Sequence, residues 1–137
     1  MDINSFYEEI IELIDSCRED EYWDFKQCHH QNTAALLHDI ICMANNRANR
    51  DAYIIFGVAD GTYEIKGVET DTNRRNQQEM INQLKSKAFA GDVRAKVELR
   101  TLNFQTHELD ILIIKNSTDT PYYLNENFRD KNKGSKS

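Results

Sequence analysis

The stretch AYIIFGVAD, residues 52–60, decides how this chain folds. It is almost wholly apolar, is rich in β-branched and aromatic residues, and closes on a glycine and an acid. A short apolar run of this kind predicts a central strand over residues 52–58 that is covered on both faces. Asp60 would then stand where the chain leaves the sheet.

Two helices are predicted on the N-terminal side of this strand. Residues 3–15 carry apolar side chains at helical spacing with acids off that stripe, which indicates an amphipathic helix. A second helix, capped by Asn32 or Thr33, is predicted to run to about residue 46. Both helices need an apolar surface to cover, and the central strand provides one.

Residues 22–26, YWDFK, separate the two helices and alternate with a period of two. This pattern predicts a strand in which Trp23 and Phe25 face the core. Asp24 and Lys26 then share the opposite, polar face. One strand would therefore carry both a core face and a charged pair.

The C-terminal half completes the predicted architecture. A short strand is expected around residues 63–68, a polar helix over 72–88, and a hairpin from strands 93–104 and 107–115. The resulting fold class is α/β (α+β): a mixed, mainly antiparallel sheet with about three helices packed on it. Residues 1–124 would form this single domain, and 125–137 a polar, disordered tail or the start of a linker.

Composition narrows the class of protein. With 137 residues, 39% hydrophobic and 29% charged, the chain is expected to be one soluble domain. The apolar runs are too short for a membrane span, and the N-terminus has no secretory pattern, so a cytoplasmic location is expected. The phosphate-binding signature of P-loop proteins is absent, so no ATP site is recognised.

Charge is unevenly distributed along the chain. The net charge of −6 is unusual for a nucleic-acid binder, but residues 1–24 alone carry nine acids and one base. Residues 72–100 hold seven bases against three acids. Such segregation permits a basic face for a nucleic acid but does not show that one exists, and an ordinary solvated surface is the simpler interpretation.

A set of acids brackets the two N-terminal strands. Glu19 and Asp24 lie five residues apart, Lys26 follows Asp24 on the same strand face, and Asp60 follows the central strand. Hard cations such as Mg²⁺ or Mn²⁺ prefer carboxylate oxygens, and a lysine can stabilise charge on a phosphate. By itself, an Asp-x-Lys pair on a strand is more often a solvated ion pair.

Four short motifs in fixed order give this set a context. They are EDEYWDFK (19–26), MANN (43–46), IIFGVAD (54–60) and IKGV (65–68). Together they resemble the Schlafen-type AlbA domain, whose pattern runs E-x-x-x-x-E-F-K, A-F-A-N, G-V-x-D and I-x-G. The resemblance extends to about residue 124 and corresponds to a single Schlafen AlbA-like lobe.

The resemblance implies a nucleic-acid-processing site. In family members that cut tRNA and rRNA, the essential acids fall on the positions of Glu19, Asp24 and Asp60, which would bind Mg²⁺ or Mn²⁺ with Lys26 assisting. The implied activity is metal-dependent endoribonuclease cleavage. Asp24 is one methylene shorter than the family's glutamate.

A second departure concerns the loop after the second predicted helix. Residues 46–51, NRANRD, replace the family's N-T-x-G-G, so close backbone approach through glycine is lost. Arg47 and Arg50 could contact phosphate there instead, or the segment could be a polar loop. The full set of candidate nucleic-acid-binding residues is Arg47, Arg50, Arg74, Arg75, Lys85 and Lys87.

Partners and alternatives follow from these motifs. The expected partner is RNA, tRNA included, or DNA, with no membrane, and a homodimer or a second lobe would complete a binding groove. One alternative is a non-catalytic DNA- or RNA-binding module of a regulatory protein. A second is a protein-interaction module that recruits a partner through the acidic first helix.

Overall fold

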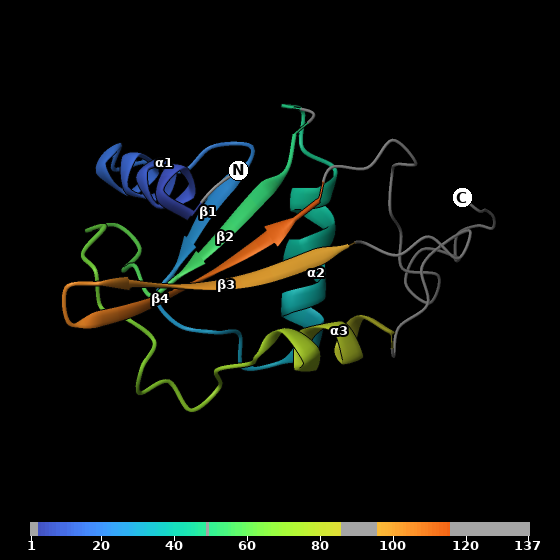
Figure 1. Ribbon diagram of the computed structural model, residues 1–137. Coiled ribbons are helices and arrows are strands. Elements are labelled where there is room, and N and C mark those ends of the chain that lie inside the picture. Colours follow the sequence, from blue (N-terminus) through green and yellow to red (C-terminus); the bar gives the residue numbers. More distant parts are fainter. Residues whose placement is uncertain (1–2, 49, 86–95, 116–137) are drawn as a thin grey trace.

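The computed structural model describes residues 3–48, 50–85 and 96–115. Its helices are α1 (Ile3–Asp15), α2 (Thr33–Ala44) and α3 (Gln77–Lys85). Its strands are β1 (Trp23–Lys26), β2 (Ala52–Phe56), β3 (Val97–Phe104) and β4 (His107–Ile114). They form a four-stranded sheet in the order β1-β2-β4-β3 (Figure 1). β1 runs parallel to β2, and the other two pairings are antiparallel, which confirms the predicted α+β class with a mixed sheet.

Helices cover both faces of the sheet. Tyr53 and Ile55 of β2 belong to the core under α1, whereas Ile54 and Phe56 belong to the core under α2 and α3. Figure 1 shows α1 and α2 on opposite sides of the strands. Every residue of β2 is buried, as the apolar run predicts for a strand covered on both faces.

β1 has the predicted two-faced character. Trp23 and Phe25 are buried in the core under α1, and the indole Nε1 of Trp23 donates to the backbone oxygen of Arg18 at 2.8 Å. Asp24 and Lys26 lie half-buried on the opposite face, which is the face that α2 covers. α2 connects β1 to β2 as the crossover that a parallel pair requires.

Two predicted elements differ in the structure. The expected helix over 72–88 begins only at Gln77, because Asn76 and Glu79 form a reciprocal cap in which each side chain accepts from the other's backbone N–H at 2.8 Å. The expected strand around 63–68 is reduced to one isolated bridge between Val58 and Ile65. Tyr63 has a φ of 59°, which ordinary strand geometry excludes.

Several expectations concern residues outside the described ranges. They include the proposed tail over 125–137, most of the link between α3 and β3, and Lys87. Within the described ranges, no helix combines the length and the apolar character needed to cross a bilayer.

Candidate carboxylate site

The structure places Glu19 beside Asp24 at the edge of the sheet, and the charge of Asp60 also acts on Glu19. Glu19 precedes β1, and its Oε2 accepts the backbone N–H of Phe25 at 2.9 Å. β1 is the edge strand of the sheet that the described residues form, so no strand among them pairs with this N–H, and the bond holds the carboxyl group of Glu19 beside Asp24. Asp60 follows β2 in an exposed turn and acts on Glu19 through its charge.

Crowding of negative charge changes the acidity of Glu19. A hydrogen bond with Asp24 is the largest cause, followed by burial and by the charges of Asp24 and Asp60, and together they raise the pKa of Glu19 to about 7. The N–H of Phe25 acts in the opposite direction. At neutral pH Glu19 therefore carries a proton for part of the time, because two adjacent carboxylates resist joint ionisation.

We expect the carboxyl carbon of Glu19 to titrate with a midpoint near 7 in carbon-detected NMR of the metal-free protein. The folded state then holds a proton that the unfolded chain loses near pH 4.5, so this group's contribution to stability falls as pH rises from 4.5 to about 7. Asp24→Asn should lower the midpoint more than Asp60→Asn does, because Asp60 acts through charge alone. A wild-type midpoint near 4.5 would contradict this geometry.

Lys26 pairs with two carboxylates, not only with Asp24. Its Nζ is 3.3 Å from Asp24 and 3.5 Å from Asp39 of α2. Burial lowers the pKa of Lys26, but the charges of Asp24 and Asp39 outweigh burial and raise it. Lys26 therefore remains an ammonium group at the edge of the acid set.

Asp39 is the site-adjacent residue that the sequence alone did not reveal. It is the one acid within α2, beside the apolar stripe, and its Oδ2 also accepts from His30 at 2.7 Å. This hydrogen bond is the largest cause that lowers the pKa of Asp39. Only the topology could have pointed to Asp39, because the helix that connects β1 to β2 packs its side chains on the face that carries Lys26.

The acid set has suitable chemistry for a hard divalent cation. Mg²⁺ is commonly held by one or two carboxylates, with water and phosphate completing its coordination. Glu19 and Asp24 are already in contact, and in the metal-free protein protonation of Glu19 reduces the repulsion between them. A bound cation would reduce the same repulsion. In the described part of the chain, no three histidine, cysteine or acidic side chains are arranged closely enough to hold a metal ion.

The candidate nucleic-acid-binding arginine Arg50 makes internal contacts. Its guanidinium stacks over the ring of Tyr22 at 3.9 Å and donates to Glu9 of α1 at 2.9 Å. Arg47 lies exposed in the same loop. Lys85 is exposed at the end of α3, and Lys87 lies outside the described residues.

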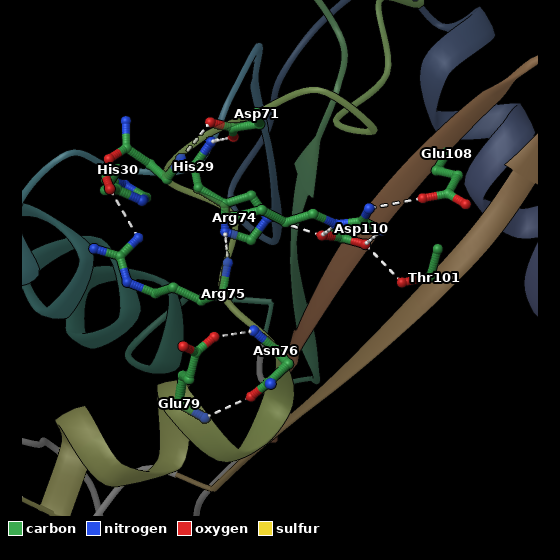
Figure 2. Close-up of polar contacts among 11 residues, drawn as sticks. His29, His30, Asp71, Arg74, Arg75, Asn76, Glu79, Thr101, Glu108 and Asp110 are labelled. Carbon is green, nitrogen blue, oxygen red and sulfur yellow. Dashed lines mark hydrogen bonds and ion pairs between the residues drawn. The ribbon is translucent and has the colours of Figure 1, made fainter.

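Arg74, which precedes α3 in the sequence, is held by a buried acid (Figure 2). Asp110 of β4 is 1% exposed and accepts from Arg74 Nε at 2.9 Å, from Arg74 Nη2 at 3.0 Å and from His29 Nε2 at 2.8 Å. Thr101 adds a bond at 2.6 Å. Burial raises the pKa of Asp110, but these hydrogen bonds outweigh it and lower the pKa to about 2. Arg74 is thus part of the internal structure.

Arg75 is also committed to internal contacts. It is 9% exposed, and it donates from Nη1 to the backbone oxygen of His30 at 2.7 Å and from Nε to Gln83 at 2.9 Å. A surface hollow of about 390 Å³ lies beside Arg74 and Arg75. The lining combines bases, acids and amides, so it does not present charge of one sign to a ligand. Its residues are Arg74, Arg75, Asn76, Gln77, Glu79, Leu99, Thr101 and Asp110.

The fold and the acid set define an α+β domain with clustered carboxylates at the edge of a mixed sheet. The family profile described as "Schlafen, AlbA_2" matches residues 19–135, which is most of the chain. The chain therefore belongs to the Schlafen AlbA_2 family. The matched region begins at Glu19, immediately at the first residue of the acid set.

Comparison with solved structures gives a partial likeness. The crystal structure of the DIP2311 protein from Corynebacterium diphtheriae is similar with a TM-score of 0.49 and 18% sequence identity. The likeness covers 82% of this chain but only 22% of that longer chain. No curated protein matches the sequence significantly.

Proposed function

We propose that this domain is a Schlafen-like, metal-dependent endoribonuclease that cleaves phosphodiester bonds in RNA, tRNA included. The observation that carries the proposal is the contact between Glu19 and Asp24 beside Lys26, with the charge of Asp60 acting on Glu19. Membership of the Schlafen AlbA_2 family supports a nucleic-acid-related role. The proposed ligands for Mg²⁺ or Mn²⁺ are the three carboxylates.

Each residue has a distinct role in the proposed reaction. When bound, the divalent cation would neutralise the phosphate and lower the pKa of a water molecule. Glu19, whose pKa is raised to about 7 in the metal-free protein, would release its proton when the cation binds and serve as a charged ligand. The ammonium of Lys26, exposed in part, would meet the negative charge that develops on the phosphate.

Phosphate contacts outside the acid set would come from exposed bases. Arg50, Arg74 and Arg75 make internal contacts, so Arg47 and Lys85 are the better candidates for phosphate contacts among the described residues. A second copy of the chain or a second lobe would add further surface to form a binding groove for RNA.

The test is cleavage of labelled tRNA and single-stranded DNA with Mn²⁺ or with EDTA. We expect metal-dependent cutting of RNA, and a rate at least about tenfold lower in Asp24→Asn and Asp60→Asn, because each removes a charge that holds the cation. Glu12→Gln, which changes an exposed acid of α1, is the matched control and should cut normally.

The remaining outcomes separate the alternatives. Binding of nucleic acid at low salt without any cutting, unchanged in the two aspartate variants, would replace this proposal with a non-catalytic nucleic-acid-binding module. Failure to bind RNA or DNA at low ionic strength would reject both functions, because phosphate contacts are strongest under that condition.

A further inference from the structure

A short series of polar contacts connects Lys26 to the interior of the domain. Asp39 Oδ2 lies 3.5 Å from the Nζ of Lys26 and 2.7 Å from the Nε2 of His30. The same carboxylate oxygen therefore faces both cationic and imidazole donors. Lys26 ends β1, His30 lies in the following loop, and Asp39 lies in the second turn of α2.

His30 is the fixed end of this series. Its side chain is 8% exposed, and its ring meets the edge of Phe56 with centroids 5.7 Å apart and planes at 83°. The guanidinium of Arg75 also donates to its backbone oxygen at 2.7 Å. A carboxylate can only accept, so Nε2 donates in this bond, and the buried Nδ1 has no hydrogen-bond partner among the described residues.

Lys26 needs such an anchor. Its side chain is 37% exposed and ends four methylenes from the backbone, so a single surface pair with Asp24 at 3.3 Å would restrain it weakly. A second carboxylate, itself held by a buried ring, limits the ammonium to the space between Asp24 and Asp39. The cost in side-chain entropy is then shared between two contacts.

We propose that Asp39, held by His30, is the positioning residue that fixes the Lys26 ammonium beside the carboxylate site. Asp39 acts through Lys26 and touches neither cation nor substrate. Its catalytic consequence rests on the proposed nuclease function, but its structural consequence does not.

The test observes Lys26 directly in the full chain without metal. An ammonium paired with two carboxylates should give a slowly exchanging Nζ signal in ¹⁵N NMR at low temperature. We expect Asp39→Asn, which keeps the size of the side chain, to speed that exchange several-fold and to increase the mobility of the Lys26 Cε methylene. Asp39→Glu, which keeps the negative charge, should retain part of the restraint on Lys26.

A matched ion pair elsewhere provides the control. Lys66 Nζ lies 3.2 Å from Glu64 on an exposed loop, so Glu64→Gln should leave the Lys26 signal unchanged. Circular dichroism and thermal unfolding show whether each variant is folded. A Lys26 signal that is absent in the wild-type protein, or unchanged in folded Asp39→Asn, overturns the proposal.

Cleavage assays on the same variants keep the two proposals apart. If the wild-type protein cuts RNA, Asp39→Asn should lower kcat more than it raises KM, because the misplaced group acts on charge that develops during the reaction. Unchanged kcat would overturn the catalytic consequence. If the wild-type protein does not cut, the nuclease function fails while the NMR comparison still decides the position of Lys26.

Discussion

Replacing Asp110 by alanine should lower the free energy of unfolding by about 3–5 kcal/mol, the range expected when one partner of a buried charged pair is removed. Asp110 lies on β4, one of the two central strands of the sheet, and accepts hydrogen bonds from His29, Arg74 and Thr101. The substitution would leave the Arg74 guanidinium and the buried His29 Nε2 without their acceptor. Urea unfolding at pH 7, monitored by circular dichroism, measures the loss.

The same arginine offers a control for this prediction. Glu108 also accepts from Arg74, at 2.7 Å, but its side chain is 41% exposed. Glu108→Gln should therefore cost under about 1 kcal/mol, as exposed ion pairs usually do. Equal effects of the two substitutions would mean that burial does not determine the strength of this network.

The network should also respond to acid. Because its hydrogen bonds lower the pKa of Asp110 from 3.8 to about 2, its contribution is present above pH 3.8 and is lost as pH falls toward 2. In Asp110→Ala this part of the acid dependence should disappear.

Periodicity and turn chemistry predicted the elements that a local pattern can define. The apolar run at 52–60 identified β2, and alternation at 22–26 identified β1 and the polar face that holds Asp24 and Lys26. The helix over 3–15 and the cap at Asn32 follow the same local rules, and Asn32 Oδ1 indeed accepts from Ala35 at 2.7 Å. In each case, the residues that determine the element lie within it or directly next to it.

Contacts between distant segments were beyond such reasoning. Arg74 and Arg75 looked like free bases in a polar helix, but their partners lie on β4 and in the loop after β1. Asp39 is unremarkable in sequence and becomes informative only once α2 packs over β1. Charge counted along a chain therefore overstates the basic surface that is left for a nucleic acid.

Gly57 directly follows β2 and helps to set the position of Asp60. Its N–H donates to the backbone oxygen of Lys26 at 2.7 Å, and its own oxygen accepts from Lys66 at 2.7 Å and Gly67 at 2.9 Å. Its φ of +112° is a conformation that L-residues rarely adopt. The glycine thus lets the chain turn out of the sheet immediately before Asp60.

Gly57→Ala should consequently destabilise the domain by about 3 kcal/mol, from backbone strain and overpacking together. A methyl group there would lie 2.7 Å from Leu109 Cδ2 and 3.2 Å from the Cα of Gly67. Gly61→Ala is the matched control, because Gly61 also has a positive φ, +88°, but has open space around the missing methyl. It should cost only about 1–2 kcal/mol, the strain alone.

The difference between the two alanine variants in urea unfolding isolates the packing cost at Gly57. Equal costs would mean that Leu109 yields to the methyl group and that strain alone matters. Since Asp60 lies three residues beyond Gly57, a displaced turn would also move its charge away from Glu19. The Glu19 carboxyl should then titrate below its wild-type pKa of about 7 in Gly57→Ala and stay nearer to it in Gly61→Ala, which would link the glycine at the strand exit to the acid set.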